Sequence, residues 1–305
     1  MKFWVGVTDK RWFDHLAQLQ PDEVNFWQPG GTQTFKAIEP GAPFLFKLHS
    51  PLNYIVGGGF FVRHSLLPLS LAWDVFGVKN GTTNIVTLKE RIFAYRNRQE
   101  ADPTIGCIIL SSPFFFGEDK WIPIPENWSL NIVQGKTYDD HDPIGMRLWA
   151  QVQAQLHSPL LNQAQSASED GHLVGPEYLV RARLGQGSFR VLVTEAYHRR
   201  CALTGERTLP ALQTAHIKPY VLSGPNHVNN GLLLRADLHL LFDRGYMTIT
   251  PDMTAEVSDR IREEFHNGKE YYALRGKRLA VLPENVAERP SREFIDWHNQ
   301  NVFVA

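Results

Sequence analysis

The chain has 305 residues, which is enough for one large domain or two of ordinary size. Hydrophobic residues make up 43% and charged residues 21%, a composition typical of a globular protein rather than a disordered one. The net charge is −1, so composition alone does not indicate a nucleic-acid-binding protein. The two cysteines, Cys107 and Cys201, are far apart, which argues against a disulfide scaffold and a paired-cysteine zinc knuckle.

The N-terminus lacks the long apolar core of a signal peptide. No run approaches the roughly 18 apolar residues that a membrane-spanning helix needs. We therefore expect a cytoplasmic protein with no membrane span.

Short extended segments dominate the first half of the chain. We expect strands at 3–9, 24–28, 44–48, 54–62 and 105–110, and helices at 12–19, 69–76, 86–96 and 146–156. Three glycines at 57–59 interrupt the fourth strand and predict a bulge or sharp bend. Thr87, with Glu90 three residues later, predicts the cap of the third helix. These elements indicate an α+β domain with a curved sheet or partly closed barrel.

A change of composition separates this part from the rest. Residues 162–175 are rich in Gln, Ala, Ser and Gly and contain few large apolar side chains. We therefore predict a first domain at 1–155, a linker at 156–185 and a second domain at 186–305.

The second domain contains the most informative stretch. His216 lies in a short apolar run that predicts a strand, Asn230 precedes a second such run, and His239 lies in a helical run. Further helices are expected at 189–197, near 259–266 and at 294–304, and a strand near 277–282.

These residue types suit the hydrolysis of a phosphodiester. An imidazole titrates near neutral pH, so His216 is a candidate general base. His239 and Asp243 are four residues apart on one helical face, where together they can hold a divalent cation such as Mg²⁺ or Mn²⁺. Asn230 has both a donor and an acceptor with which to fix a loop. Arg200 and Arg235 are candidate phosphate clamps.

The stretch resembles the HNH endonuclease family. The matching motifs are Cys201-Ala202-Leu203-Thr204-Gly205, Ala215-His216-Ile217-Lys218-Pro219-Tyr220, Asn230-Gly231-Leu232-Leu233-Leu234-Arg235 and Leu238-His239-Leu240-Leu241-Phe242-Asp243-Arg244-Gly245. The resemblance covers about residues 186–300 and implies two strands and a helix around one metal ion. It also implies His216 as general base, Asn230 as the loop-orienting residue and His239 as a metal ligand.

The sequence departs from the family's pattern at two points. Many relatives have Asp or His immediately before the first histidine, where this chain has Ala215. The second ligand is then expected to be Asp243. Many relatives also carry a structural zinc on two cysteine pairs, which is not expected here with Cys201 alone.

The first domain resembles the PUA superfamily, which includes the EVE and SRA-type readers of modified bases. The resemblance rests on the opening strand, the helix that starts near Trp12, and the segments 43–48 and 60–62. It implies a base flipped into an aromatic pocket. Our candidates for this pocket are Trp27, Tyr54 and Trp73, and Asp74 or Asn53 could read a base edge.

Together the resemblances suggest a modification-dependent DNA endonuclease, similar to a type IV restriction enzyme. It would read 5-methyl- or 5-hydroxymethylcytosine in double-stranded DNA and act as a homodimer, at least on DNA. The alternatives are a reader of an unmodified sequence or of RNA, and a DNA-binding protein with an inactive or structural HNH module.

Overall fold

The computed structural model describes residues 1–96, 100–129, 131–156 and 184–304. The chain divides into two compact units, Met1–Ala182 and Arg183–Ala305. The predicted linker at 156–185 lies outside the described residues except at its ends. No helix in the described part of the chain is long and apolar enough to cross a membrane.

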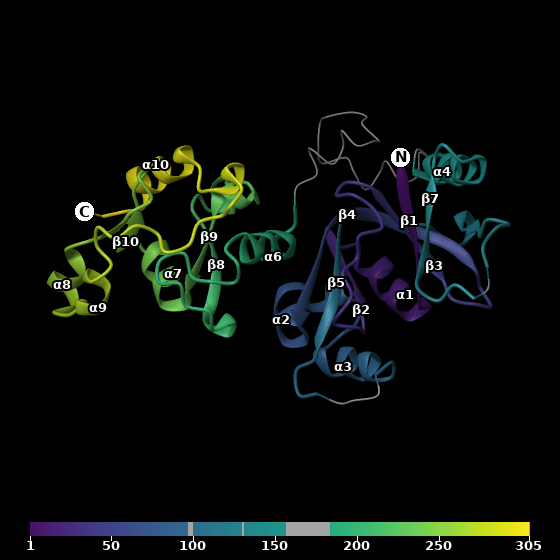
Figure 1. The fold of residues 1–305 in the computed structure, drawn as a ribbon, viewed down its shortest axis with the longest axis horizontal. Coiled ribbons are helices and arrows are strands. Elements are labelled where there is room, and N and C mark those ends of the chain that lie inside the picture. Colours follow the sequence, from purple (N-terminus) through teal and green to yellow (C-terminus); the bar gives the residue numbers. More distant parts are fainter. Residues whose placement is uncertain (97–99, 130, 157–183, 305) are drawn as a thin grey trace. The chain divides into compact units, whose positions relative to one another are not determined.

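The first unit is a mixed α+β structure around a seven-stranded sheet (Figure 1). Its strands are β1 (Lys2–Thr8), β2 (Glu23–Gln28), β3 (Pro43–Leu48), β4 (Tyr54–Pro68), β5 (Thr104–Phe115), β6 (Ile122–Pro123) and β7 (Gly135–Asp139). Its helices are α1 (Lys10–Leu19), α2 (Leu69–Phe76), α3 (Ile85–Phe93) and α4 (Pro143–Leu156), with short 3₁₀ turns η1 (Gly77–Asn80) and η2 (Glu118–Lys120).

The sheet has the order β2-β5-β4-β3-β1-β7, and β6 pairs with β4. β1 and β3 are parallel, and the other paired strands described are antiparallel. β2 and β7 lie at opposite ends of this order and do not pair with each other. The described strands therefore form an open sheet and not a closed barrel.

A hydrophobic core lies on each face of this sheet. One strand can contribute to both cores, because alternate side chains of a strand point to opposite faces. Phe44 and Phe46 of β3 belong to a core that includes Trp12 of α1. Leu45, between them, belongs to a second core that includes Trp149 of α4. All six residues of β3 are buried, so this strand anchors both layers.

Two predictions about local structure have different outcomes. The glycine-rich segment forms part of the single strand β4, whose register with β5 shifts between Gly58 and Phe60, so the predicted bulge is confirmed. The predicted cap of α3 is wrong, because Asn84 caps this helix and its side chain accepts a hydrogen bond from the backbone N–H of Thr87. Asparagine at the position before the first turn is a stronger cap than a threonine within it.

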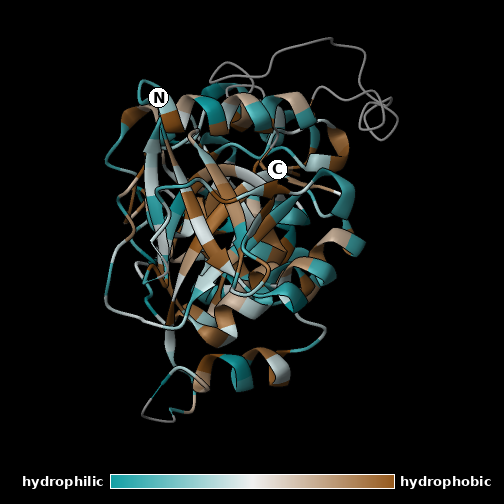
Figure 2. Ribbon diagram, turned by 90° about the vertical axis from the view of Figure 1, so that its right-hand side faces the viewer, coloured by the Kyte–Doolittle hydropathy of each residue, from teal (hydrophilic) through white to brown (hydrophobic). Residues whose placement is uncertain are grey.

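The second unit combines two small sheets with helices. Its elements are α6 (Gln186–Ala196), η3 (Leu209–Ala211), β8 (Leu212–His216), η4 (Tyr220–Leu222), η5 (Val228–Asn230), β9 (Gly231–Arg235), α7 (Ala236–Asp243), β10 (Met247–Ile249), β11 (Ala255–Val257), α8 (Arg260–Phe265), α9 (Lys269–Tyr272), η6 (Val286–Glu288) and α10 (Arg292–Asn301). The antiparallel pairs are β8–β9 and β10–β11. Figure 2 shows helices that carry both hydrophobic and hydrophilic residues, as expected for helices with one buried face.

The predicted strand near 277–282 does not form. The described residues show only an isolated bridge between Thr254 and Arg278. Leu279 donates its backbone N–H to Met253, whereas Val281 donates to Ala202. Because neighbouring residues bond to different segments, the stretch joins parts of the unit without entering a sheet.

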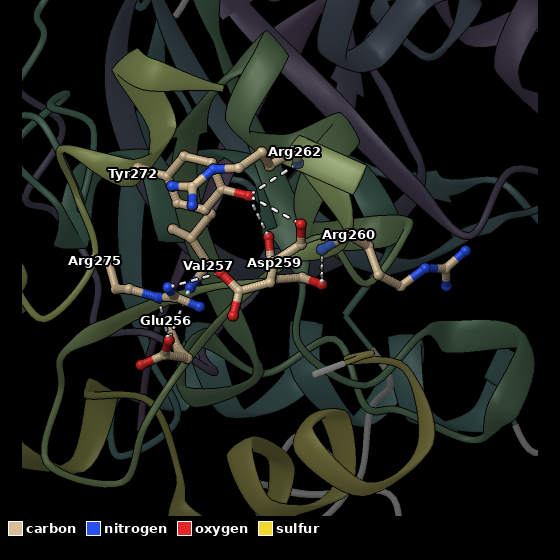
Figure 3. A network of polar contacts seen from close by, with 8 residues as sticks. Glu256, Val257, Asp259, Arg260, Arg262, Tyr272 and Arg275 are labelled. Atoms are coloured by element: carbon tan, nitrogen blue, oxygen red, sulfur yellow. Dashed lines mark hydrogen bonds and ion pairs between the residues drawn. The ribbon is translucent and has the colours of Figure 1, made fainter. Parts of the chain in front are cut away.

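A network of polar contacts joins α8 and α9 to the segment after β11 (Figure 3). The hydroxyl of Tyr272 donates toward the carbonyl oxygen of Ser258 and accepts from the backbone N–H of Arg262. Arg275 contacts the carboxylates of Glu256 and Asp259. The network links these elements at the end of the unit that lies away from β8.

His298 anchors α10 to the core of the second unit. It is 2% exposed, and its ring stacks on Phe242 with the ring centroids 3.8 Å apart. Its Nε2–H donates to the carbonyl oxygen of Phe242 at 3.1 Å, and Nδ1 lies 2.8 Å from the hydroxyl oxygen of Thr248. Burial lowers the pKa of His298 to about 4, which favours the neutral imidazole.

The buried His298 predicts a loss of stability in acid. In the unfolded chain its pKa returns to about 6.5, so between pH 6.5 and 4 the unfolded state binds the proton first. The second unit should lose on the order of 3 kcal/mol over this range. Urea unfolding of the full chain at several pH values would measure this. His298→Gln should flatten the dependence, whereas His266→Gln, at an exposed position, should not. An equally steep dependence in His298→Gln would contradict the assignment.

Candidate active site

Two antiparallel strands and the following helix bring the predicted residues together. His216 is the last residue of β8 and pairs with Gly231, the first residue of β9. α7 follows β9 directly and carries His239 and Asp243. Figure 1 shows β8, β9 and α7 as neighbours in the second unit. The strand, loop-strand and helix positions predicted for His216, Asn230 and His239 are therefore confirmed.

Asn230 fixes the long connection between the two strands. It is completely buried, and its Oδ1 accepts from the backbone N–H of Lys218 at 2.9 Å. Its Nδ2 donates to the carbonyl oxygens of Lys218 and Pro225, each at 2.9 Å. One side chain therefore closes the loop 218–225 directly behind His216.

The ring of His216 is held from two sides. Its Nε2 lies 2.9 Å from Oδ1 of Asn226, and its face stacks on Phe189 of α6 with the ring centroids 4.0 Å apart. Gly231 permits this packing, because a Cβ there would lie 2.5 Å from Val193 and 3.0 Å from Phe189. The absence of a side chain in β9 thus lets α6 approach the histidine.

The hydrogen bonds also define the tautomer of His216. Nδ2 of Asn226 donates to the carbonyl oxygen of Leu184 at 2.6 Å, so Oδ1 is the amide atom that faces the histidine. An amide oxygen only accepts, and Nε2 of His216 must therefore carry the hydrogen. In the neutral ring Nδ1 is then the unprotonated nitrogen.

Burial lowers the pKa of His216 below its usual value. The hydrogen bond to Asn226 and the charge of Asp243 oppose this shift, whereas the charge of His239 adds to it. His239 and Asp243 are thus close enough to act electrostatically on His216. The net effect favours the neutral imidazole, which is the form that accepts a proton.

His239 and Asp243 form a pair suited to a divalent cation. Nε2 of His239 lies 3.2 Å from Oδ2 of Asp243, and Nδ1 lies 2.9 Å from Oε1 of Gln213 on β8. An amide oxygen at Nδ1 selects the tautomer whose Nε2 has a free lone pair. Two metal bonds of about 2.1 Å at a right angle place their ligand atoms about 3 Å apart, so this pair fits one coordination sphere.

The residue before His216 does not add a ligand. Ala215 is completely buried in the core of the second unit, on the strand face opposite to His216.

Among the described residues, one group of three candidate ligands has metal-like spacing, namely Asp139, Asp140 and His141 of the first unit. The N-terminal ammonium group already contacts Asp139 and Asp140.

The two predicted phosphate clamps are engaged within the chain. Arg235 holds both carboxylate oxygens of Asp237, at 3.0 and 2.6 Å, and pairs with Leu212 at the end of β8 opposite to His216. Arg200 donates to the carbonyl oxygen of Gly205 at 3.4 Å. Neither contact directs a guanidinium group toward His216.

The predicted aromatic pocket of the first unit does not assemble as a whole. The indole N–H of Trp27 donates to the carbonyl oxygen of Asn80. The side chain of Asn80 donates to the carbonyl oxygen of Ala72, which precedes Trp73 and Asp74 in α2. Tyr54 lies elsewhere and packs on Trp121. Trp27 of β2 and Ser65 of β4 both pair with Cys107 of β5, so they lie at the same level of the sheet. Tyr54 is eleven residues from Ser65 along β4, a separation on the order of 30 Å in an extended strand. The long strand β4 thus separates Tyr54 from the other candidates.

A surface hollow of about 460 Å³ follows the end of β2, two residues beyond Trp27. It is lined by Pro29, Gly30, Gly31, Thr32, Tyr95, Arg96, Glu100 and Thr104. The side chain of Tyr95 is 67% exposed and offers an aromatic face at this hollow.

Three residues of the candidate site were not predicted from the sequence. Asn226, Phe189 and Gln213 each touch a predicted residue through its side chain. Asn226 follows a Gly-Pro turn, where asparagine is common for reasons of backbone conformation alone. Phe189 resembled an ordinary core residue of α6. Only the folded arrangement reveals these contacts.

The geometry is that of a small ββα unit with a candidate histidine base and a histidine–carboxylate pair. Residues 201–250 match the family described as HNH endonuclease, and this range includes His216, Asn230, His239 and Asp243. The second unit therefore carries an HNH endonuclease domain. No curated protein matches the chain.

Two solved structures of restriction endonucleases show low similarity to the chain. "Modification dependent TagI restriction endonuclease" shares 15% identity with a TM-score of 0.28, over 92% of this chain and 75% of that one. "Structure of the Type IV phosphorothioation-dependent restriction endonuclease ScoMcrA" shares 12% identity with a TM-score of 0.19, over 78% of this chain and 51% of that one. TM-scores this low do not establish a shared fold.

Asn226 is predicted to hold His216 in its productive orientation. Asn226→Ala should lower kcat about 100-fold with little change in KM, because the misplaced imidazole still lies in an intact substrate site. Asn226→Asp should raise the pKa of His216, because a carboxylate beside Nε2–H stabilises the imidazolium ion. Since the base acts only when unprotonated, the acid limb of the pH–rate profile should move to higher pH.

Asn285→Ala provides the control, because this asparagine caps η6 elsewhere in the second unit. The rates would be compared between variants that have the same thermal midpoint of unfolding. An unchanged acid limb in Asn226→Asp would exclude a contact between this residue and the base.

Proposed function

We propose that the chain is a modification-dependent DNA endonuclease. The second unit would hydrolyse a phosphodiester, and the first unit would select DNA that contains 5-methyl- or 5-hydroxymethylcytosine. The observation that supports the nuclease activity most directly is the arrangement of His216, whose Nε2 is engaged by Asn226 while Nδ1 remains unprotonated.

In the proposed reaction, Nδ1 of His216 takes a proton from a water molecule. The water oxygen forms a new bond to phosphorus, and the bond from phosphorus to the leaving sugar oxygen breaks. Asn230 keeps the loop that follows the base closed, and Phe189 and Asn226 prevent rotation of the imidazole. This geometry keeps the base ready before substrate arrives.

His239 and Asp243 would hold one divalent cation, Mg²⁺ or Mn²⁺, and Gln213 would orient His239 through Nδ1. A cation bound there would neutralise charge on the phosphate and on the departing oxygen. With two protein ligands, the remaining positions would be filled by water and phosphate oxygens, as is common for Mg²⁺.

For the first unit we propose a PUA-like fold that flips the modified base out of the duplex. The many aromatic side chains and the hollow after β2 support this proposal, because a flipped base is held by stacking. The reading pocket would lie at the Trp27 end of β2, with the exposed ring of Tyr95 beside it. Tyr54 would not take part.

Each chain carries one candidate nuclease site. Cutting both strands of a duplex therefore requires two chains or two successive visits by one chain. We propose that the chain acts as a homodimer when bound to DNA.

We predict that His239 and Asp243 of α7 bind a divalent cation in the absence of DNA, so this binding can be measured without an activity assay. Mn²⁺ titrated into the full chain should bind at least tenfold more weakly to His239→Ala and to Asp243→Ala than to wild type, because each change removes one of two protein ligands. Calorimetry measures this without substrate. Asp139→Asn, in the other carboxylate cluster, is the matched control. Loss of binding only in Asp139→Asn would place the cation in the first unit.

Cleavage of matched plasmids tests the function as a whole. Unmodified, 5-methylcytosine and 5-hydroxymethylcytosine plasmids would be incubated with wild type and with His216→Ala in Mg²⁺ or Mn²⁺. We expect wild type to cut modified DNA, and His216→Ala to lose at least 100-fold in rate. EDTA should abolish cleavage.

The possible failures of this experiment have different meanings. Equal cutting of the three plasmids would reject the modified-base reader and leave the nuclease. Full activity of His216→Ala would reject the assigned base. No cutting of any DNA would favour the inactive-module alternative.

A further inference from the structure

The loop that follows the candidate base presents three consecutive apolar side chains to solvent. Tyr220, Val221 and Leu222, which form η4, are 44%, 88% and 53% exposed. We call these three residues the apolar tip. Isolated apolar residues on a surface are normal, whereas a contiguous group beside a functional site indicates a contact surface.

The apolar tip is held in place relative to His216. Leu222 and Gly224 donate their backbone N–H groups to the carbonyl oxygen of Pro219, and Asn230 bonds to both Lys218 and Pro225. Gly224 lies so close to Lys218 that a Cβ would be 1.9 Å from its carbonyl oxygen. The loop is therefore a closed turn, and the tip projects from it at a fixed distance from the base.

The charge around the tip suits a polyanion. Residues 217–227, which include the tip, contain Lys218 and no aspartate or glutamate. Lys218 lies over the ring of Trp297 in α10, with Nζ 5.7 Å from the ring centroid. The acidic residues of that helix are Glu293 and Asp296, and Asp296 pairs with Arg292 at 3.5 Å.

We propose that the apolar tip enters the minor groove of duplex DNA beside the phosphate that His216 attacks. This inference rests on the proposed nuclease function and adds a contact that orients the duplex. Phosphates attract the ammonium group of Lys218, but apolar side chains gain nothing from phosphates. They gain by leaving water against the sugars and base steps of the minor groove, where apolar wedges bind in other DNA-bending proteins.

The test compares DNA binding by two serine variants of the full chain. Both are made in the His216→Ala background, so that the DNA stays intact. Val221→Ser with Leu222→Ser removes the apolar surface without adding charge. Phe265→Ser is the matched control, because Phe265 is 59% exposed on α8, at the end of the unit away from β8. Binding to a labelled duplex that carries 5-methylcytosine is followed by fluorescence anisotropy.

We expect the tip variant to bind about tenfold more weakly or worse, and the control to bind like its parent. Netropsin, which occupies the minor groove, should compete with the parent and have less effect on the residual binding of the tip variant. In the otherwise wild-type chain the tip substitutions should slow cleavage of subsaturating duplex by a similar factor.

Unchanged affinity of the tip variant, at an unchanged thermal midpoint, would overturn the inference. A loss of affinity that coincides with dissociation of a dimer in sedimentation would also overturn it, because the tip would then face a second copy of the chain. In both cases wild type still cuts DNA and the proposed function stands. Failure of wild type to bind or cut any duplex would reject the function and the inference together.

Discussion

The three hydrogen bonds of Asn230 are the constraint on which the candidate site depends. They join a buried side chain to backbone groups at both ends of the loop 218–225. A buried amide left without partners would cost free energy, so the loop and the asparagine stabilise each other only when both are in place. As a result, the strand that ends in His216 and the loop that follows it behave as one rigid piece.

Around this piece, the second unit holds the candidate base through contacts that differ in kind. Phe189 supplies a flat apolar face, Asn226 an acceptor at Nε2, and Gly231 the space that the approach of Phe189 requires. Burial favours the neutral imidazole, and the nearby Asp243 partly offsets that effect. The histidine is therefore neutral for reasons of environment and oriented for reasons of packing, which are separate properties of the same fold.

The metal side of the site is built differently. His239 is half-buried and Asp243 is exposed on one face of α7, and Gln213 of β8 contacts Nδ1 of His239. Ala215, one position before the base, is buried on the other strand face and contributes no ligand. In the proposed function the pair would supply two ligands and the substrate would complete the coordination sphere, which would couple cation binding to the arrival of DNA.

The sequence by itself determined the position of each candidate residue within its element. Strand alternation, helical spacing and the order of His216, Asn230 and His239 are local properties, and they predicted β8, β9 and α7 correctly. It also predicted the bulge in β4, because three consecutive glycines disturb any strand. Tertiary structure alone decided which distant side chains meet. Asn226 contacts His216 because a turn folds back, and Tyr54 leaves the predicted pocket because β4 is a single long strand. Contacts of this kind depend on distances between elements, which no local pattern encodes.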